Sequence, residues 1–147
     1  AGCPMGLGVD GSASNDCSNM IQELRLAFLL QRLKYGSSKV SHLDVLRWAT
    51  SGAAACLGRS DIGTIAVGAQ ADLALFSLDE PRFSGYDDPI AALILCGAHK
   101  SEYVMVQGRW VVVRGEVMGI DVSELLREHS ESASHLRQLY DTAKTSA

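Results

Sequence analysis

The 147-residue sequence lacks the features that mark several large classes of protein. It has no apolar run close to the ~20 residues that a membrane-spanning helix needs, and no segment that resembles a signal peptide. It has no Lys/Arg cluster, and its net charge of −4 disfavours a polyanion as partner. A phosphate-binding glycine loop and internal repeats are also missing. We therefore expect a cytoplasmic protein that acts neither on nucleic acid nor in a membrane.

The cysteines are few and lie far apart in the sequence, with no paired spacing. No Cys-x-x-Cys pair occurs, so neither a zinc site nor a disulfide framework is indicated. In a chain that is 47% hydrophobic and 20% charged, which is typical of a globular protein, such cysteines are expected to be reduced core residues. The four are Cys3, Cys17, Cys56 and Cys96.

The segment from Met5 to Asp10 has the pattern of a short strand that ends in a carboxylate. Met5, Leu7 and Val9 alternate with two glycines and Asp10, which is the period of a strand. The glycines leave room for a ligand below the acid. An alternative is that Asp10 and the glycine after it only form a turn, since Asp-Gly is a common turn pair.

Two helices are predicted after the polar stretch that follows Asp10. An apolar face at i, i+3, i+4 spacing starts at Met20 and should end near Gly36, after a cap by Asn15, Asp16 or Asn19. Ser41 and Asp44 form a variant of the capping box and open a second helix that Gly58 closes. Small residues from Ser51 to Ala55 would let this helix approach its neighbour closely, and Trp48 is expected in the core.

The second half of the chain has a strand pattern followed by a helix. Strands are predicted at 63–67 and 72–78, a helix starts at Asp88-Pro89, and 103–106 pairs with 110–113 as a hairpin. Asp121 caps a C-terminal helix whose apolar stripe is expected to dock on the barrel or on a sister subunit, with His129 as a packing residue. The stripe comprises Val122, Leu125, Leu126, His129, Ala133, Leu136 and Tyr140.

Several of these segments resemble the amidohydrolase superfamily, in its branch of aminohydrolases and chlorohydrolases that act on purines, pyrimidines and triazines. The sequence Gly-Val-Asp-Gly-Ser-Ala-Ser-Asn-Asp at 8–16 is similar to that branch's last barrel strand and loop, and Leu-Leu-Gln-Arg follows at 29–32. Residues 61–73 are similar to the exit from the barrel, and 104–109 to the hairpin of a small β domain. The resemblance spans roughly residues 1–119 and is strongest to deaminases of 8-oxoguanine.

The resemblance implies an α/β fold: the C-terminal end of a (β/α)8 TIM barrel of a metal-dependent hydrolase, part of a small β-sandwich, and a C-terminal helix. The expected boundaries are 1–58, 59–119 and 120–147. A complete barrel needs about 250 residues, so we expect this sequence to be the C-terminal part of a longer enzyme and inactive alone.

The resemblance also implies one divalent metal ion, Zn²⁺ or alternatively Fe²⁺, in each active site. Asp10 is the position that matches a metal ligand, and it is expected to be catalytic as well. Ser12 and Ser14 are candidates for substrate binding; the alternative is that they satisfy only backbone groups in the turn. The remaining ligands and the proton-shuttling glutamate of the branch have no counterpart here, because no His-x-His pair occurs among His42, His99, His129 and His135.

The expected reaction is hydrolytic deamination of a purine base, with 8-oxoguanine first, in which metal-bound hydroxide attacks and ammonia leaves. Alternative substrates are guanine, cytosine, a thioadenosine or a triazine. A different alternative is a non-catalytic relative or structural subunit. The resemblance implies a small nucleobase-like substrate as partner, and a homo-oligomer.

Overall fold

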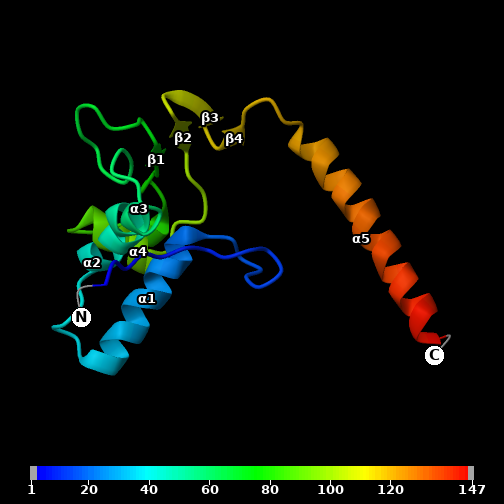
Figure 1. Cartoon of the computed structure of the whole chain (residues 1–147). Helices are drawn as coiled ribbons and strands as arrows, with labels where there is room; N and C mark the ends of the chain where they lie inside the picture. Colours follow the sequence, from blue (N-terminus) through cyan, green and yellow to red (C-terminus); the bar gives the residue numbers. More distant parts are fainter. Residues whose placement is uncertain (1–2, 146–147) are drawn as a thin grey trace. The chain divides into compact units, whose positions relative to one another are not determined.

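The computed structural model describes residues 3–145, which belong to two compact units (Figure 1). The first unit extends to Glu116 and the second begins at Val117. The first unit contains four α-helices, a π-helical turn, a short 3-10 helix and most of a small sheet. It also contains the segment around Asp10.

Helix α1 (Met20–Tyr35) has the predicted ends. The side chain of Asn19 accepts hydrogen bonds from the amides of Ile21 and Gln22, and Gly36, at φ +94°, ends the helix. Asn19 was one of three candidate caps, and its role is confirmed. Leu24 and Phe28 on one face of α1 are buried.

The predicted second helix is divided by a π-helical turn. Helix α2 (His42–Arg47) begins with the predicted capping box of Ser41 and Asp44. The π-helical turn η1 (Trp48–Gly52) follows, and α3 (Ala53–Cys56) completes the segment. Trp48 is half-buried against the core, so its prediction as a core residue is confirmed in part.

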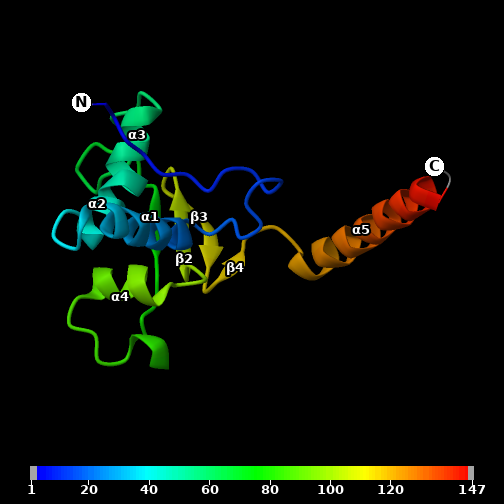
Figure 2. The same cartoon turned by 90° about the horizontal axis from the view of Figure 1, so that it is seen from below.

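Helix α4 (Pro89–Cys96) starts as predicted, with Asp88 as its cap and proline in its first turn, and it follows a short 3-10 helix η2 (Pro81–Phe83). Helices α1, α2 and α4 pack side by side (Figures 1 and 2). They enclose one buried cluster, and α1, η2 and α4 enclose a second. The first cluster is Leu24, Phe28, Val45 and Ile94, and the second is Ile21, Phe83, Ala92 and Ala98.

The sheet has the order β1-β2-β3-β4. Its strands are β1 (Leu73–Leu75), β2 (Tyr103–Val106), β3 (Arg109–Val113) and β4 (Glu116–Val117), and β2 is antiparallel to both β1 and β3. Gln107 and Gly108 both have positive φ, which is the geometry of a two-residue type I′ hairpin turn. The predicted hairpin is therefore confirmed, with its second strand starting one residue early.

One predicted strand is wrong, and a second has no partner among the described residues. Residues 63 and 64 form bends, 65 and 66 have no regular structure, and Val67 begins a turn; no strand of the described chain pairs with this segment, and Ile65 is 92% exposed. The segment from Met5 to Val9 is extended but belongs to no sheet within residues 3–145. Alternating apolar residues favour a strand only when a partner supplies the other half of the hydrogen bonds.

The expectation of buried cysteines is also wrong. All four are free thiols, as expected, but each is exposed. Cys17 lies in the polar loop before α1, and Cys56 and Cys96 lie at the last residues of short helices, where the chain turns at the surface.

The second unit is mainly helix α5 (Val122–Thr145). Asp121 caps it as predicted, because its Oδ1 accepts a hydrogen bond of 3.0 Å from the Glu124 amide. No side chain between Val122 and Thr145 is buried, so His129 is not a packed histidine within this unit. Docking of the apolar stripe on another surface stays a prediction. Within residues 3–145, none of the helices combines the length and hydropathy that a bilayer span requires.

Candidate functional site

The extended segment before Asp10 lies directly against the π-helical turn. The Leu7 amide donates a hydrogen bond of 3.0 Å to the Trp48 carbonyl oxygen. A Cβ on Gly6 would lie 2.7 Å from Ala53 Cα, and a Cβ on Gly52 would overlap the Met5 carbonyl oxygen. The small residues of the helix therefore permit the predicted close approach. The neighbour that packs against them is the extended segment before Asp10. The space beside Gly6 is occupied by Ala53 of the helix, so this glycine does not leave room for a ligand.

Asp10 follows this anchored segment in a left-handed conformation, with φ +62°. Aspartate is one of the few residues other than glycine that adopts this region readily. Its Oδ1 accepts a hydrogen bond of 2.7 Å from the Gly11 amide. This bond is the main reason that the pKa of the Asp10 carboxyl lies below its ordinary value, and the nearby Ser14 hydroxyl lowers it further. The side chain is exposed and is ionised at neutral pH, the state in which a carboxylate binds a metal ion or accepts a proton.

The predicted turn after Asp10 is present, and it organises the two candidate serines. The Ser14 amide and hydroxyl both donate to the Gly11 carbonyl oxygen, at 2.9 and 3.1 Å. Ser14 thus satisfies backbone groups, as one of the two interpretations expected. Ser12 is exposed in the same turn. Substrate binding by either serine is a proposal.

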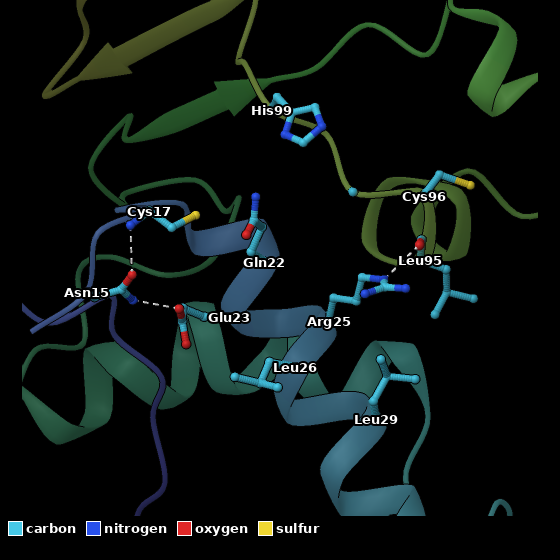
Figure 3. Close-up of a pocket in the computed structure, with 11 residues that line it drawn as sticks. Asn15, Cys17, Gln22, Glu23, Arg25, Leu26, Leu29, Leu95, Cys96 and His99 are labelled. Carbon is cyan, nitrogen blue, oxygen red and sulfur yellow. Dashed lines mark hydrogen bonds between the residues drawn. The ribbon is translucent and has the colours of Figure 1, made fainter.

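A hydrogen-bonded pair beyond this turn was not predicted from the sequence. Asn15 Nδ2 donates to Glu23 Oε1 at 2.7 Å, and Asn15 Oδ1 accepts from the Cys17 amide at 3.1 Å (Figure 3). The sequence predicts Asn15 as a candidate helix cap and not as a partner of Glu23. No helical or strand period relates a loop residue to one eight positions later, so spacing alone could not have found the pair.

Two cavities lie beside α1, and neither is lined by Asp10. The first, of about 560 Å³, has a polar wall that includes Asn15, Glu23, Arg25 and His99 (Figure 3). The second, of about 730 Å³, lies between α1, η1 and β1 and has a mostly apolar lining. The chemistry of Asp10 is therefore separate from both cavities within the described residues.

The other candidate ligands do not gather around Asp10. Among residues 3–145, no group of three or more His, Cys, Asp or Glu side chains is arranged to hold a metal ion. His42 contacts Asp88, while His99 and Cys96 line the first cavity. Asp10 is thus a single ionised carboxylate that suits one position in a larger ligand set.

Comparison with known proteins gives a consistent result. The model of the amidohydrolase family matches residues 1–111. The chain is 58% identical to 8-oxoguanine deaminase of Pseudomonas aeruginosa over 136 residues, which are 92% of this chain and 30% of that protein. It is 34% identical to an isoxanthopterin deaminase from an unknown prokaryote, over 85% of this chain and 29% of that protein. The chain thus spans about a third or less of the length of these relatives.

Solved structures agree with the sequence comparison. A zinc-bound adenosine deaminase from Xanthomonas campestris superposes with a TM-score of 0.84 at 29% identity, covering 90% of this chain and 31% of that one. An atrazine chlorohydrolase from Arthrobacter aurescens, also complexed with zinc, superposes with a TM-score of 0.81 at 34% identity, covering 88% and 30%.

Proposed function

Because the chain belongs to the amidohydrolase family and shares its α/β fold, we propose that it is the C-terminal part of a hydrolase that deaminates 8-oxoguanine. The identity of 58% to 8-oxoguanine deaminase is the observation that carries this proposal. In the proposed layout, residues 1–58 complete a TIM barrel, 59–119 form part of a small β-sandwich, and 120–147 form a C-terminal helix.

Asp10 is the residue of this chain that would hold a divalent metal ion, with zinc favoured over iron because two structural neighbours contain zinc. The other ligands would come from outside this sequence. When bound, such an ion supplies Lewis-acid activation of water at neutral pH. The ionised Asp10 carboxylate suits this role because its lowered pKa keeps it unprotonated.

The same carboxylate can carry the proton that the reaction moves. Hydrolytic deamination forms a bond between the water oxygen and the ring carbon that bears the amino group, and breaks the bond from that carbon to nitrogen. One Asp10 carboxylate oxygen accepts the proton that water loses, and it returns a proton to the departing nitrogen, which leaves as ammonia. Proton transfer of this kind typically contributes ~10² to 10⁴-fold to rate.

The test is ammonia release by the protein from the complete reading frame, with zinc supplied. Substrates are 8-oxoguanine, guanine, cytosine and adenosine at equal concentration. We expect release from 8-oxoguanine to be fastest. Equal or faster release from another base would overturn the substrate assignment. No release from any base would leave a triazine hydrolase or a non-catalytic relative as the remaining candidates.

A second candidate is hydrolysis of a triazine, which is favoured by structural likeness to a triazine hydrolase at a TM-score of 0.82 and 34% identity. An amino- and a chloro-substituted triazine belong in the same assay. Release of ammonia or chloride from these compounds alone would assign the protein to that branch, and inactivity on all compounds would favour a non-catalytic relative.

A further inference from the structure

We propose that Glu23 is a positioning residue for Asp10, and that it acts through the side chain of Asn15 and the turn at residues 11–14. The inference rests on the proposed function, because that function gives Asp10 its chemical role. It adds a residue that makes no contact with Asp10 and that lies on a different element.

The first link joins the helix to the loop. Glu23 lies in the first turn of α1, and its Oε1 accepts the hydrogen bond of 2.7 Å from Asn15 Nδ2 (Figure 3). A hydrogen bond to a carboxylate is stronger than one between neutral groups. The next residue, Leu24, is only 1% exposed and fixes this part of α1 in the core. Glu23 is thus a half-buried hydrogen-bond acceptor on a part of α1 that is packed into the core.

The second link is Asn15 itself, which holds the loop in both directions. Its Oδ1 accepts from the Cys17 amide, toward α1. The backbone amide of Asn15 donates to the Gly11 carbonyl oxygen at 2.9 Å, back toward Asp10. With Nδ2 bound to Glu23, three polar groups of this residue each have a partner.

The third link reaches the carboxylate. The Gly11 carbonyl oxygen accepts from the amides of Ser14 and Asn15, and the Gly11 amide donates to Asp10 Oδ1 at 2.7 Å. Asp10 has a positive φ, and a non-glycine residue keeps this sparsely populated backbone conformation when contacts around it stabilise it. Loss of the Asn15 anchor is therefore expected to loosen the turn and to misplace the carboxylate.

Glu23 has one other possible role, because a negative charge in the first turn of a helix also stabilises the helix dipole. Substitutions can separate the two roles. Glu23→Gln removes the charge but keeps a side-chain oxygen that can accept from Asn15. Glu23→Ala removes both. Asn15→Asp places two carboxylates together, whereas Asn15→Asp combined with Glu23→Gln restores the hydrogen bond in the opposite direction, with the glutamine amide as donor.

The experiment measures kcat and KM for ammonia release in these four variants of the protein from the complete reading frame. A misplacement of about 1 Å at a reacting group can cost ~10²-fold, so we expect Glu23→Ala and Asn15→Asp to lower kcat by ~10 to 100-fold with little change in KM. Glu23→Gln and the double variant should lie within about threefold of wild type. Glu102→Gln, which changes an exposed glutamate before β2, is the matched control.

A second readout does not depend on activity. Amide hydrogen exchange of residues 10–17 should be faster in Glu23→Ala than in wild type and restored in Glu23→Gln, with exchange in the middle of α1 unchanged. The proposal is overturned if Glu23→Ala keeps wild-type kcat and exchange, or if Glu23→Gln is as impaired as Glu23→Ala. If wild type releases no ammonia from any substrate, the proposed function fails, and the exchange of residues 10–17 alone decides whether Glu23 holds the loop.

Discussion

The Nε2 atom of His42 lies 2.9 Å from Oδ2 of Asp88, so the first residue of α2 contacts the residue that caps α4. Oδ1 of the same carboxylate accepts hydrogen bonds from the Ile90 and Ala91 amides. One side chain thus joins two helices that are far apart in the sequence. The Ala91 amide is the main reason that the pKa of Asp88 lies below its ordinary value, and His42 lowers it further.

Stability should fall in acid as Asp88 becomes protonated. Because the pKa is lower in the folded state than in the unfolded state, the carboxylate stabilises the fold above the ordinary aspartate pKa of about 4, and this contribution is lost as pH falls through the folded-state pKa. Asp88→Asn keeps a capping oxygen that does not titrate. We expect urea unfolding at pH 7 and pH 3 to show a smaller loss of stability in this variant than in wild type.

Asp87→Asn is the control for that measurement, because Asp87 is next to Asp88 in the sequence but is not the N-cap of α4. Its loss of stability between pH 7 and pH 3 should match that of wild type. An equal acid response in all three proteins would mean that Asp88 does not link folding to pH.

Packing of α1 should be sensitive to one leucine and tolerant of another. Leu24 is 1% exposed in the core, and Leu33 on the same helix is 85% exposed. Leu24→Ala removes buried methyl groups and leaves a cavity, so it should lower the free energy of unfolding by about 2–5 kcal/mol. Leu33→Ala should change it by less than about 0.5 kcal/mol. Urea titration of both variants checks this, and similar losses would contradict the core assignment.

The contact between the segment before Asp10 and the helix should depend on Gly6. An added methyl group at Gly6 would lie 2.7 Å from Ala53 Cα, whereas one at Gly8 would meet nothing within 4 Å. Gly6→Ala should therefore destabilise the protein by about 1–3 kcal/mol, the usual cost of overpacking. Gly8→Ala is the matched control, and its melting temperature should stay close to that of wild type. A reversed order of the two melting temperatures would show that this segment does not pack as described.

Asp10→Asn should abolish turnover in the protein from the complete reading frame and leave the fold intact. The amide cannot take the proton from water, and it is a poor metal ligand. Circular dichroism and metal content accompany the rate measurement, and Asp16→Asn controls for loss of a nearby charge. Retention of more than about 5% of wild-type kcat would remove Asp10 from the proposed mechanism, in which one proton transfer contributes ~10²-fold or more.

Local signals in the sequence predicted most of the secondary structure. Asn19 and Gly36 mark the ends of α1, and Ser41 with Asp44 begins α2, because caps are satisfied by neighbouring backbone groups. The features that depend on distant residues were not predicted. No strand forms at 63–67, because no other segment of the described chain pairs with these residues. The Asn15–Glu23 pair depends on how the loop folds back over α1.

The π-helical turn has a consequence for insertions and deletions. A π-helical turn holds about one residue more than an α-helical turn, so deleting that residue leaves the residues that follow in nearly the same orientation, whereas deleting one residue from a regular α-helix rotates all that follows by about 100°. Deletion of a single residue within Trp48–Gly52 would therefore restore a regular helix and keep the small face of Ala53 toward Gly6, whereas a deletion within α2 would turn that face away. In sequences related to this one, a one-residue difference in length between Ser41 and Gly58 should then fall in the π-helical turn and not in α2.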